Sequence, residues 1–397
     1  MTQTLRQNDP GLYQRRRDAL VAELGRPVLV FGMGSALGAG SKSHGALRYL
    51  TGWDGHESAS LLVLTQTGAR LICASPFMVP LAAETLPELD PVYLPPDRWA
   101  GLIRDHIPAG TVELIGLDEL PMGIARHLHP VIREDDTASA VLDRMRVIKE
   151  PAALELHRAG AAICDAIFAR LPSVLTVGAS VADAQRDLES FAVSQGADAC
   201  RMWLTIRPQA DRPRYWPEET QGFVGAGDQV LVGIALTVDG HWAHGIRMGA
   251  VGQMRPDHAR LLDIVAVCLR AGLDHARPGL PLTDLVDAME DTFRAGTLSL
   301  DRHDLQRFRF GHGLGMSYED PILTDAFVQS FGVKAPAKRP DGAGGILAPG
   351  MVLELHPNLF LPGVGGAALG EMVIIGETGA ETPITTPLTP ILFGSDY

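Results

Sequence analysis

The sequence feature that most restricts the fold is an Asp-Gly pair at 239–240, which joins two long apolar segments. The segment before it reads VLVGIALTV and the segment after it reads HWAHGIRMGAV. Asp-Gly between two strand-like segments is the strongest short-range signal for a β-hairpin, because both residues tolerate the positive φ angles of a tight turn. We therefore expect antiparallel strands at 229–238 and 241–250, with His241 and His244 on the second strand.

Helical and strand patterns surround this hairpin in blocks, which is typical of an α+β architecture. Apolar residues recur at helical spacing over 152–171, 181–195, 256–275 and 283–295, and further strand patterns lie at 351–360 and 369–376. The preceding part of the chain mixes a helical pattern at 11–24 and a strand at 28–33 with a Gly/Ser-rich turn at 34–43 and strand-like segments such as RYLTGW (48–53). We expect an α/β domain over 1–145 and an α+β domain over 146–397.

Length and charge narrow the function classes. A chain of 397 residues is long enough for two domains with their own cores. Its net charge is −13, so it does not provide the positive charge that binding a phosphate backbone requires. The 4 cysteines are scattered without a C-x-x-C pair, and no apolar run approaches the ~18 residues of a membrane span. These patterns favour a cytoplasmic protein with reduced thiols and exclude nucleic acid and membrane as its main partners.

Histidines stand in two further motifs. His312 lies within Gly-His-Gly-x-Gly, where glycines allow close backbone approach, and Glu354 and His356 share one face of the segment MVLELHPNLF. With 13 histidines in the chain, any one of them alone is more often structural than functional.

The order of these segments resembles the creatinase, prolidase and methionine aminopeptidase family, whose C-terminal domain has the pita-bread fold. The similar segments are YLTGW, RVIKEPAALELHRAGAAICD, the hairpin, FGHGLGMSYEDP, APGMVLELHPNLF and LGEMVIIGETGAE. The resemblance implies a creatinase-like α+β chain of two domains, an α/β domain over 1–145 followed by a pita-bread catalytic domain over 146–397. It also implies a homodimer in which the partner's first domain completes each pocket.

The family's metallohydrolases hold two divalent ions with two Asp, one His and two Glu. By resemblance, these five positions correspond here to Gly233, His244, His312, His356 and Gly370, or to Glu371 in place of Gly370 if the register shifts by one residue. Loss of these carboxylates argues against a dinuclear site, whereas two acidic positions have both become His. The resemblance therefore implies one divalent transition metal per chain bound by three histidines. Imidazole ligands favour Fe or Zn, with Mn, Ni or Cu as alternatives, and a metal-free creatinase-like pocket or a degenerate site is the competing interpretation.

Two activities of the family are disfavoured. The stretch at 207–228, where the family has a functional histidine, contains none, and Trp216 or its neighbours occupy that place. The position of the hairpin carboxylate of creatinase corresponds to Ile246, and the His-Glu-x-Pro segment of the peptidases is replaced by Glu319-Asp320-Pro321. Neither creatinase chemistry nor ordinary Xaa-Pro peptidase chemistry is expected.

The leading hypothesis is a metal-dependent hydrolase that cleaves a C–N bond of a small, polar, non-peptide molecule. Glu354 and Glu319 are candidates for proton transfer or for orienting a His ligand, and Arg247, assisted by Arg201, Arg207 or Arg214, is a candidate for holding a substrate carboxylate. Trp216 and the region around Trp53, His56 and Glu57 are candidates for the pocket wall. The alternatives are a lyase or an Fe(II)/O₂-dependent oxygenase on the same fold, and a metal-free or non-catalytic binding protein.

Overall fold

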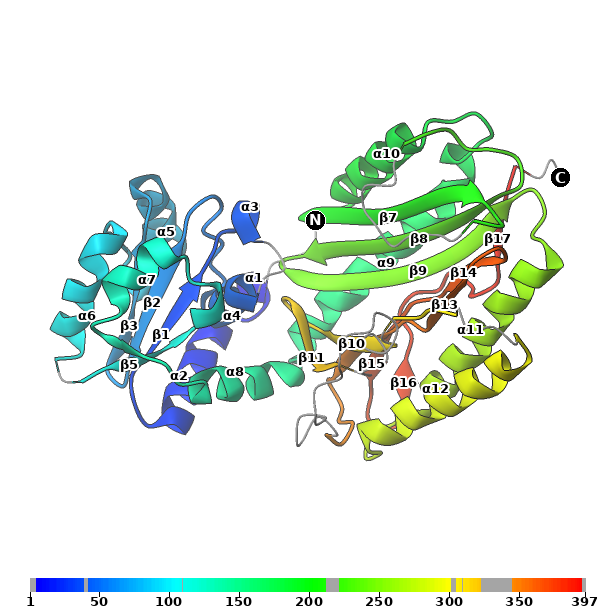
Figure 1. Cartoon of the computed structure of the whole chain (residues 1–397). Helices are drawn as coiled ribbons and strands as arrows, with labels where there is room; N and C mark the ends of the chain where they lie inside the picture. Colours follow the sequence, from blue (N-terminus) through cyan, green and yellow to red (C-terminus); the bar gives the residue numbers. More distant parts are fainter. Residues whose placement is uncertain are drawn as a thin grey trace. The chain divides into compact units, whose positions relative to one another are not determined.

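A computed structural model of the chain describes residues 5–38, 42–108, 110–211, 221–300, 305–308, 310–322 and 345–394. These residues divide into two compact units (Figure 1). The N-terminal unit consists mainly of Gln3–Val147 together with Gly315–Tyr318, and the C-terminal unit of Ile148–Leu314 and Glu319–Tyr397.

The N-terminal unit is built on a mixed sheet in the order β4-β3-β2-β1-β5-β6. Its central strand β1 is fully buried, pairing antiparallel with β2 and parallel with β5. The strands are β1 Val28–Gly32, β2 Ser60–Thr65, β3 Gly68–Cys73, β4 Val92–Tyr93, β5 Val112–Ile115 and β6 Ile132–Arg133. The helices are α1 Leu5–Asn8, α2 Leu12–Leu24, α3 Ser35–Gly38, α4 Lys42–Thr51, α5 Val79–Thr85, α6 Trp99–His106, α7 Met122–Leu128 and α8 Thr137–Val147.

One part of this unit differs from the sequence-based expectation. The stretch expected as a turn followed by a strand at 48–53 forms the helices α3 and α4 instead, apart from residues 39–41, which lie outside the described residues. In α4 the apolar residues Ala46, Leu47 and Leu50 are buried at helical spacing. A short apolar run such as RYL fits either structure, so periodicity over so few residues was misleading.

Among the described residues, the C-terminal unit begins with a long helix and contains a sheet of three antiparallel strands, β7, β8 and β9, to which β17 adds in parallel (Figure 1). Its first sheet has the order β17-β9-β8-β7, and the Asp-Gly turn joins β8 to β9 as expected, with φ of 43° at Asp239 and 75° at Gly240. The helix α9 packs against β8 and β9, where Gly160 allows a close approach: a Cβ there would lie 2.5 Å from that of Ala243. The elements are α9 Pro151–Val174, α10 Val181–Ser194, β7 Ala199–Pro208, β8 Asp228–Val238, β9 His241–Val251 and β17 Ile391–Phe393.

The second sheet of this unit has the order β11-β10-β12-β15-β16. A backbone bridge between Ile246 and Gly370 connects it to the first sheet. Helices α11 and α12 pack together, and with both sheets they enclose an apolar core that includes Leu231, Val265 and Leu355. The elements are α11 Pro256–His275, α12 Leu282–Thr297, β10 Gly311–Leu314, β11 Tyr318–Ile322, β12 Val352–Leu355, β13 Asn358–Leu361, β14 Gly365–Ala368, β15 Glu371–Ile375 and β16 Ala380–Glu381.

The strand expected at 351–360 is interrupted at His356 and Pro357. It forms β12 in one sheet and β13 in a separate ladder with β14. Proline has no N–H to donate to a sheet, so the break at Pro357 follows from the sequence. As a result, His356 directly follows the end of β12.

Candidate metal centre

His244 reaches the site from β9, which the hairpin turn places beside β8. It lies opposite Ala235, whereas His241 is three residues earlier and therefore on the other face of the strand. On that other face, the His241 ring contacts the His157 ring of α9 at a centroid distance of 5.4 Å. Only His244 therefore shares a face with Gly233 and Ile246, where the two sheets meet.

His312 and Glu354 reach the site from the second sheet. They are directly opposite one another in the antiparallel pairing of β10 with β12, so their side chains point to the same side of the sheet. His312 Nδ1 lies 2.9 Å from the Gly313 carbonyl oxygen. Because a carbonyl only accepts hydrogen bonds, Nδ1 carries a proton, and in the neutral ring Nε2 then presents its lone pair to the site.

Three histidine rings and one carboxylate come together at this junction. The centroid of the His244 ring is 6.2 Å from that of His312 and 6.3 Å from that of His356, and the last two are 5.3 Å apart. Glu354 Oε2 contacts His244 Nδ1 and is 3.7 Å from His312 Nε2. Ligand atoms of His244, His312 and Glu354 all lie within 4.8 Å of one another.

These groups are almost entirely removed from solvent. His244 and His312 are 3% and 2% exposed, Glu354 is 0% exposed, and His356 is partly buried. Within the described residues, Glu354 Oε1 accepts no hydrogen bond. Burying an ionised carboxylate costs free energy unless an opposite charge or hydrogen bonds compensate for the lost hydration. A cation held between the carboxylate and neutral imidazoles would supply that opposite charge. The donor set of imidazole nitrogens and a carboxylate oxygen fits a divalent transition metal better than Mg²⁺ or Ca²⁺.

Two glycines make room for the cluster. A Cβ at Gly370 would lie 2.8 Å from Glu354 Oε1 and 2.7 Å from Ile246 Cγ1, so the Glu354 side chain occupies the space that a side chain at 370 would need. A Cβ at Gly233 would lie 2.8 Å from Cε3 of Trp203. The sequence has no carboxylate at 233 or 370, and a side chain there would require Trp203, or Glu354 and Ile246, to move.

Trp203 is a neighbour of the cluster that the sequence did not reveal. Its ring meets the His244 ring edge-on at a centroid distance of 5.2 Å. It lies on β7 directly opposite Gly233, and β7 was not among the expected strands. The available signal was the recurrence of apolar residues at alternate positions, 200, 202, 204 and 206, which predicts a strand. Pairing that strand with β8 is what places Trp203 opposite Gly233.

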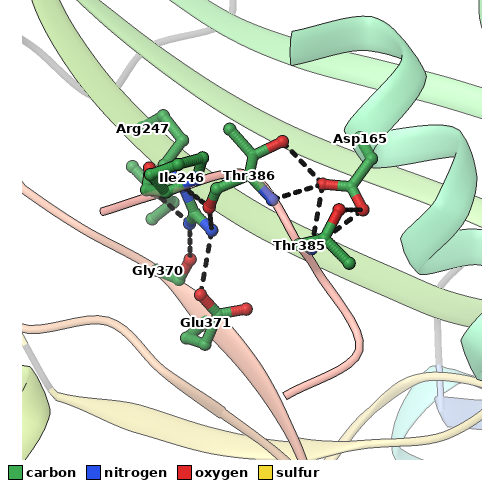
Figure 2. A network of polar contacts seen from close by, with 8 residues as sticks. Asp165, Ile246, Arg247, Gly370, Glu371, Thr385 and Thr386 are labelled. Carbon is green, nitrogen blue, oxygen red and sulfur yellow. Dashed lines mark hydrogen bonds and ion pairs between the residues drawn. The ribbon is translucent and has the colours of Figure 1, made fainter. Parts of the chain in front are cut away.

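Arg247 was expected to hold a substrate carboxylate, but the structure directs it into protein (Figure 2). The side chain is 0% exposed, and its Nη2 donates to Glu371 Oε2 at 2.9 Å and to the Thr386 carbonyl at 2.7 Å. Nη1 donates to the Gly370 carbonyl at 2.6 Å. We therefore replace the expected substrate contact by a structural role, in which Arg247 ties β9 to β15 and to the segment after β16.

Glu371 lies on the opposite face of β15 from Gly370. In the pairing with β12 it is opposite Leu355, whereas Glu354 is opposite Met372. Burial raises the pKa of Glu371 to about 7, although the Arg247 guanidinium acts in the other direction. Its register and its pairing with Arg247 leave Glu371 out of the histidine cluster, so we no longer include it among candidate ligands.

The remaining candidate residues lie elsewhere. His56 is exposed in the N-terminal unit, where its φ is 49° and its backbone N–H donates to Asp54 Oδ1 at 2.9 Å. Glu319 belongs to β11, but the structure describes only its backbone. Trp216 and Arg214 lie outside the described residues. Arg207 pairs with Asp211 at 3.7 Å, and Arg201 is exposed on β7.

The fold is the two-domain pita-bread architecture of a class of metallohydrolases. The chain belongs to metallopeptidase family M24, whose model matches residues 155–377. Among curated proteins, the chain is 28% identical over 293 residues to a probable dipeptidase PepE of Mycobacterium bovis, covering 72% of this chain and 68% of that protein. It is 20% identical over 293 residues to a creatinase of a Bacillus species, covering 72% of this chain and 64% of that protein.

Solved structures share the fold across almost the whole chain. An Xaa-Pro dipeptidase from Bacillus anthracis superposes with a TM-score of 0.75 at 18% identity, covering 96% of this chain and 100% of that one. A prolidase from Pyrococcus horikoshii OT3 superposes with a TM-score of 0.74 at 15% identity, covering 96% and 99%. These likenesses agree with the two-domain pita-bread architecture expected from the sequence. No described helix combines the length and the apolar character needed to span a membrane.

Proposed function

We propose that this protein is a metal-dependent hydrolase that cleaves a C–N bond of a small, polar, non-peptide molecule. In this proposal, one divalent transition metal per chain is held by His244, His312 and His356. The observation that carries the proposal is the convergence of three histidine rings, with centroids 5.3–6.3 Å apart, beside a fully buried carboxylate.

Fe or Zn is the proposed ion, with Mn, Ni or Cu as alternatives, because each accepts several imidazole nitrogens. A bound divalent ion of this kind polarises a carbonyl or lowers the pKa of coordinated water toward neutrality. The residues of the chain contribute the rest. His312 is held in one tautomer by the Gly313 carbonyl, and the buried setting of His244 excludes bulk water from the cluster.

A single ion is proposed because two of the five family positions carry no ligand. Gly233 faces Trp203 and Gly370 faces Glu354, and in each case an added Cβ would come within 2.8 Å of the neighbour. A second divalent cation needs further negative charge close by, and Glu354 is the carboxylate grouped with His244 and His312 among the described residues.

The choice of a non-peptide substrate rests on the missing peptidase residues and on the range of relatives. The sequence has Glu319-Asp320-Pro321 where the family's peptidases have His-Glu-x-Pro, and no histidine in 207–228. Besides dipeptidases, the relatives include the creatinase and an agropine synthesis cyclase of Rhizobium rhizogenes, 26% identical over 205 residues and covering 46% of this chain and 45% of that protein. Such names are compatible with small nitrogen compounds as substrates.

The test compares hydrolysis of two substrate panels by protein loaded with Fe(II) or Zn(II). One panel contains Xaa-Pro dipeptides, and the other contains small non-peptide amides, lactams and guanidino compounds. We expect turnover only in the second panel, with loss of that turnover in His312→Ala and retention in His241→Ala. Efficient cleavage of Xaa-Pro dipeptides would contradict the non-peptide assignment.

A second candidate is favoured by one observation. Two imidazoles and one carboxylate, as in His244, His312 and Glu354, form the donor set typical of Fe(II) sites that activate O₂. Under this alternative, turnover by the Fe(II) protein requires O₂ and stops under anaerobic conditions, whereas hydrolysis or elimination continues unchanged. Measuring turnover with and without O₂ therefore separates an oxygenase from a hydrolase and from a lyase.

A further inference from the structure

Glu354 has a position that neither a surface carboxylate nor an ordinary ion pair explains. Its side chain is 0% exposed, and its carboxylate contacts His244 Nδ1 and lies 3.7 Å from His312 Nε2. The carboxylate therefore lies between two imidazoles that come from different sheets.

The contact with His312 is suited to a shared cation. His312 Nδ1 donates to the Gly313 carbonyl, so Nε2 is the ring nitrogen that points toward Glu354 Oε2, and in a neutral ring it offers a lone pair there. Two electron-rich atoms that face one another inside a protein repel each other unless a positive charge lies between them. A proton would serve one such contact, but a metal ion serves both imidazoles and the carboxylate together.

The backbone around Glu354 leaves room for this arrangement. Gly370, on the neighbouring strand, lies on the same face, and a Cβ there would approach Glu354 Oε1 to 2.8 Å. Oε1 accepts no hydrogen bond from the described residues. Because Gly370 has no side chain, the carboxylate of Glu354 can occupy the space beside it.

We infer that Glu354 is a direct ligand of the metal, grouped with His244 and His312, and that Gly370 is the residue that leaves space for it. This inference rests on the proposed function, since it concerns the same ion, and it adds a carboxylate to the proposed three-histidine set. One negative ligand lowers the net charge at the ion and favours divalent Fe, Zn or Mn over monovalent copper.

The test moves the carboxylate from one strand to the other. Metal-free wild type, Glu354→Ala, Glu354→Ala/Gly370→Glu and Glu354→Ala/Gly370→Ala are titrated with Co(II) and Zn(II) against a chromophoric chelator. The Co(II) absorption spectrum reports the ligand set independently of activity. Circular dichroism and unfolding in chelator establish that each variant is folded, and Glu354→Gln provides a variant of unchanged shape.

We expect Glu354→Ala and Glu354→Gln to weaken metal binding by more than about 100-fold, above the 10–100-fold effect of groups that only orient a ligand. The double variant with Glu at 370 should recover most of the affinity and a Co(II) spectrum close to the wild-type one, whereas the double variant with Ala at 370 should not. The last variant is the matched control, because it fills the same space without a carboxylate.

Affinity of Glu354→Gln within tenfold of wild type would overturn the inference and leave the three-histidine proposal intact. Equal affinity of the two double variants, both folded by circular dichroism, would overturn the role given to Gly370. Absence of metal binding by wild type would instead overturn the proposed function itself, and the role of Glu354 with it. The two failures are therefore distinguishable in one set of titrations.

Discussion

His241 and His244 are three residues apart on β9, so their side chains point to opposite faces of the strand and only one ring faces the cluster. His244 lies beside Trp203 and Glu354, whereas His241 contacts His157 on the helix-covered face. The two histidines have the same chemistry and nearly the same burial, so they form a matched pair for mutation.

We predict that His244→Ala lowers metal affinity by more than about 100-fold, because removing a ligand exceeds the effect of disturbing a group that orients one. His241→Ala should retain the metal within about tenfold by the same comparison and should remain folded. Chelator competition measures both affinities. Equal affinities in the two variants would show that the histidine at 244, where the family has an Asp, has no connection with metal binding.

A second residue-scale prediction concerns Glu371, because burial raises the pKa of its carboxyl from the ordinary value of 4.5 to about 7. Between these values the folded state holds a proton that the unfolded state has lost, so this group's contribution to stability falls as the pH rises. Glu371→Gln removes this dependence. Relative to wild type, the variant should therefore gain stability from pH 5 to pH 8.

Urea unfolding of both proteins in chelator, at several pH values, measures that difference. All other groups are the same in both proteins, so their contributions cancel from the comparison. A difference in the free energy of unfolding that is constant with pH, or that moves in the opposite direction, would show that Arg247 keeps Glu371 ionised throughout.

Residue-scale prediction from the sequence was uneven, for physical reasons. His244, His312 and His356 were selected by their places in motifs, and their short ring-to-ring distances agree with that selection, but their role as ligands stays a prediction. Trp203 could not be selected, because its importance arises only from its place opposite Gly233 in a pairing between strands. Arg247 was misjudged because a sequence does not reveal that a charged side chain is surrounded by carbonyls.

At the scale of elements, the segment after β16 is held in place by one carboxylate on α9. Asp165 accepts hydrogen bonds from the backbone N–H and hydroxyl groups of both Thr385 and Thr386, with the shortest at 2.6 Å (Figure 2). Through the Thr386 carbonyl, this segment also contacts Arg247. The segment thus links α9 to β9, the strand that carries His244.

We predict that Asp165→Ala lowers the free energy of unfolding by about 2–3 kcal/mol, because several charge-assisted hydrogen bonds are lost together. Asp187→Ala is the control, because Asp187 forms a half-exposed pair with Arg170 and should cost less than about 1 kcal/mol. Chemical unfolding measures both. Similar losses in the two variants would show that the segment after β16 is not anchored through Asp165.

The elements of the C-terminal unit were more predictable than those of the N-terminal unit. Long amphipathic helices such as α11 and the Asp-Gly hairpin carry strong local signals, and their bounds agree with the expected ones. Short elements do not carry such signals, so the apolar run in α4 fits a strand as well as a helix. Pro357 does carry a signal, because a proline cannot donate to a sheet, and β12 ends just before it.

At the scale of the whole molecule, we propose a homodimer, the commonest closed assembly and the one that the family resemblance implies. Light scattering at micromolar concentration should give about twice the chain mass of 42.5 kDa. A single species at the mass of one chain would contradict the proposal. The measurement is best made with and without metal, because dimer formation should not depend on an ion bound within one chain.

We propose that this member of family M24 has a mononuclear centre built on His244, His312 and His356. The most direct test is elemental analysis of purified protein after expression in metal-supplemented medium, referred to the protein concentration. The account predicts about one transition-metal ion per chain, reduced to near zero in His312→Ala and unchanged in His241→Ala. Two ions per chain, or none in the wild-type protein, would contradict it.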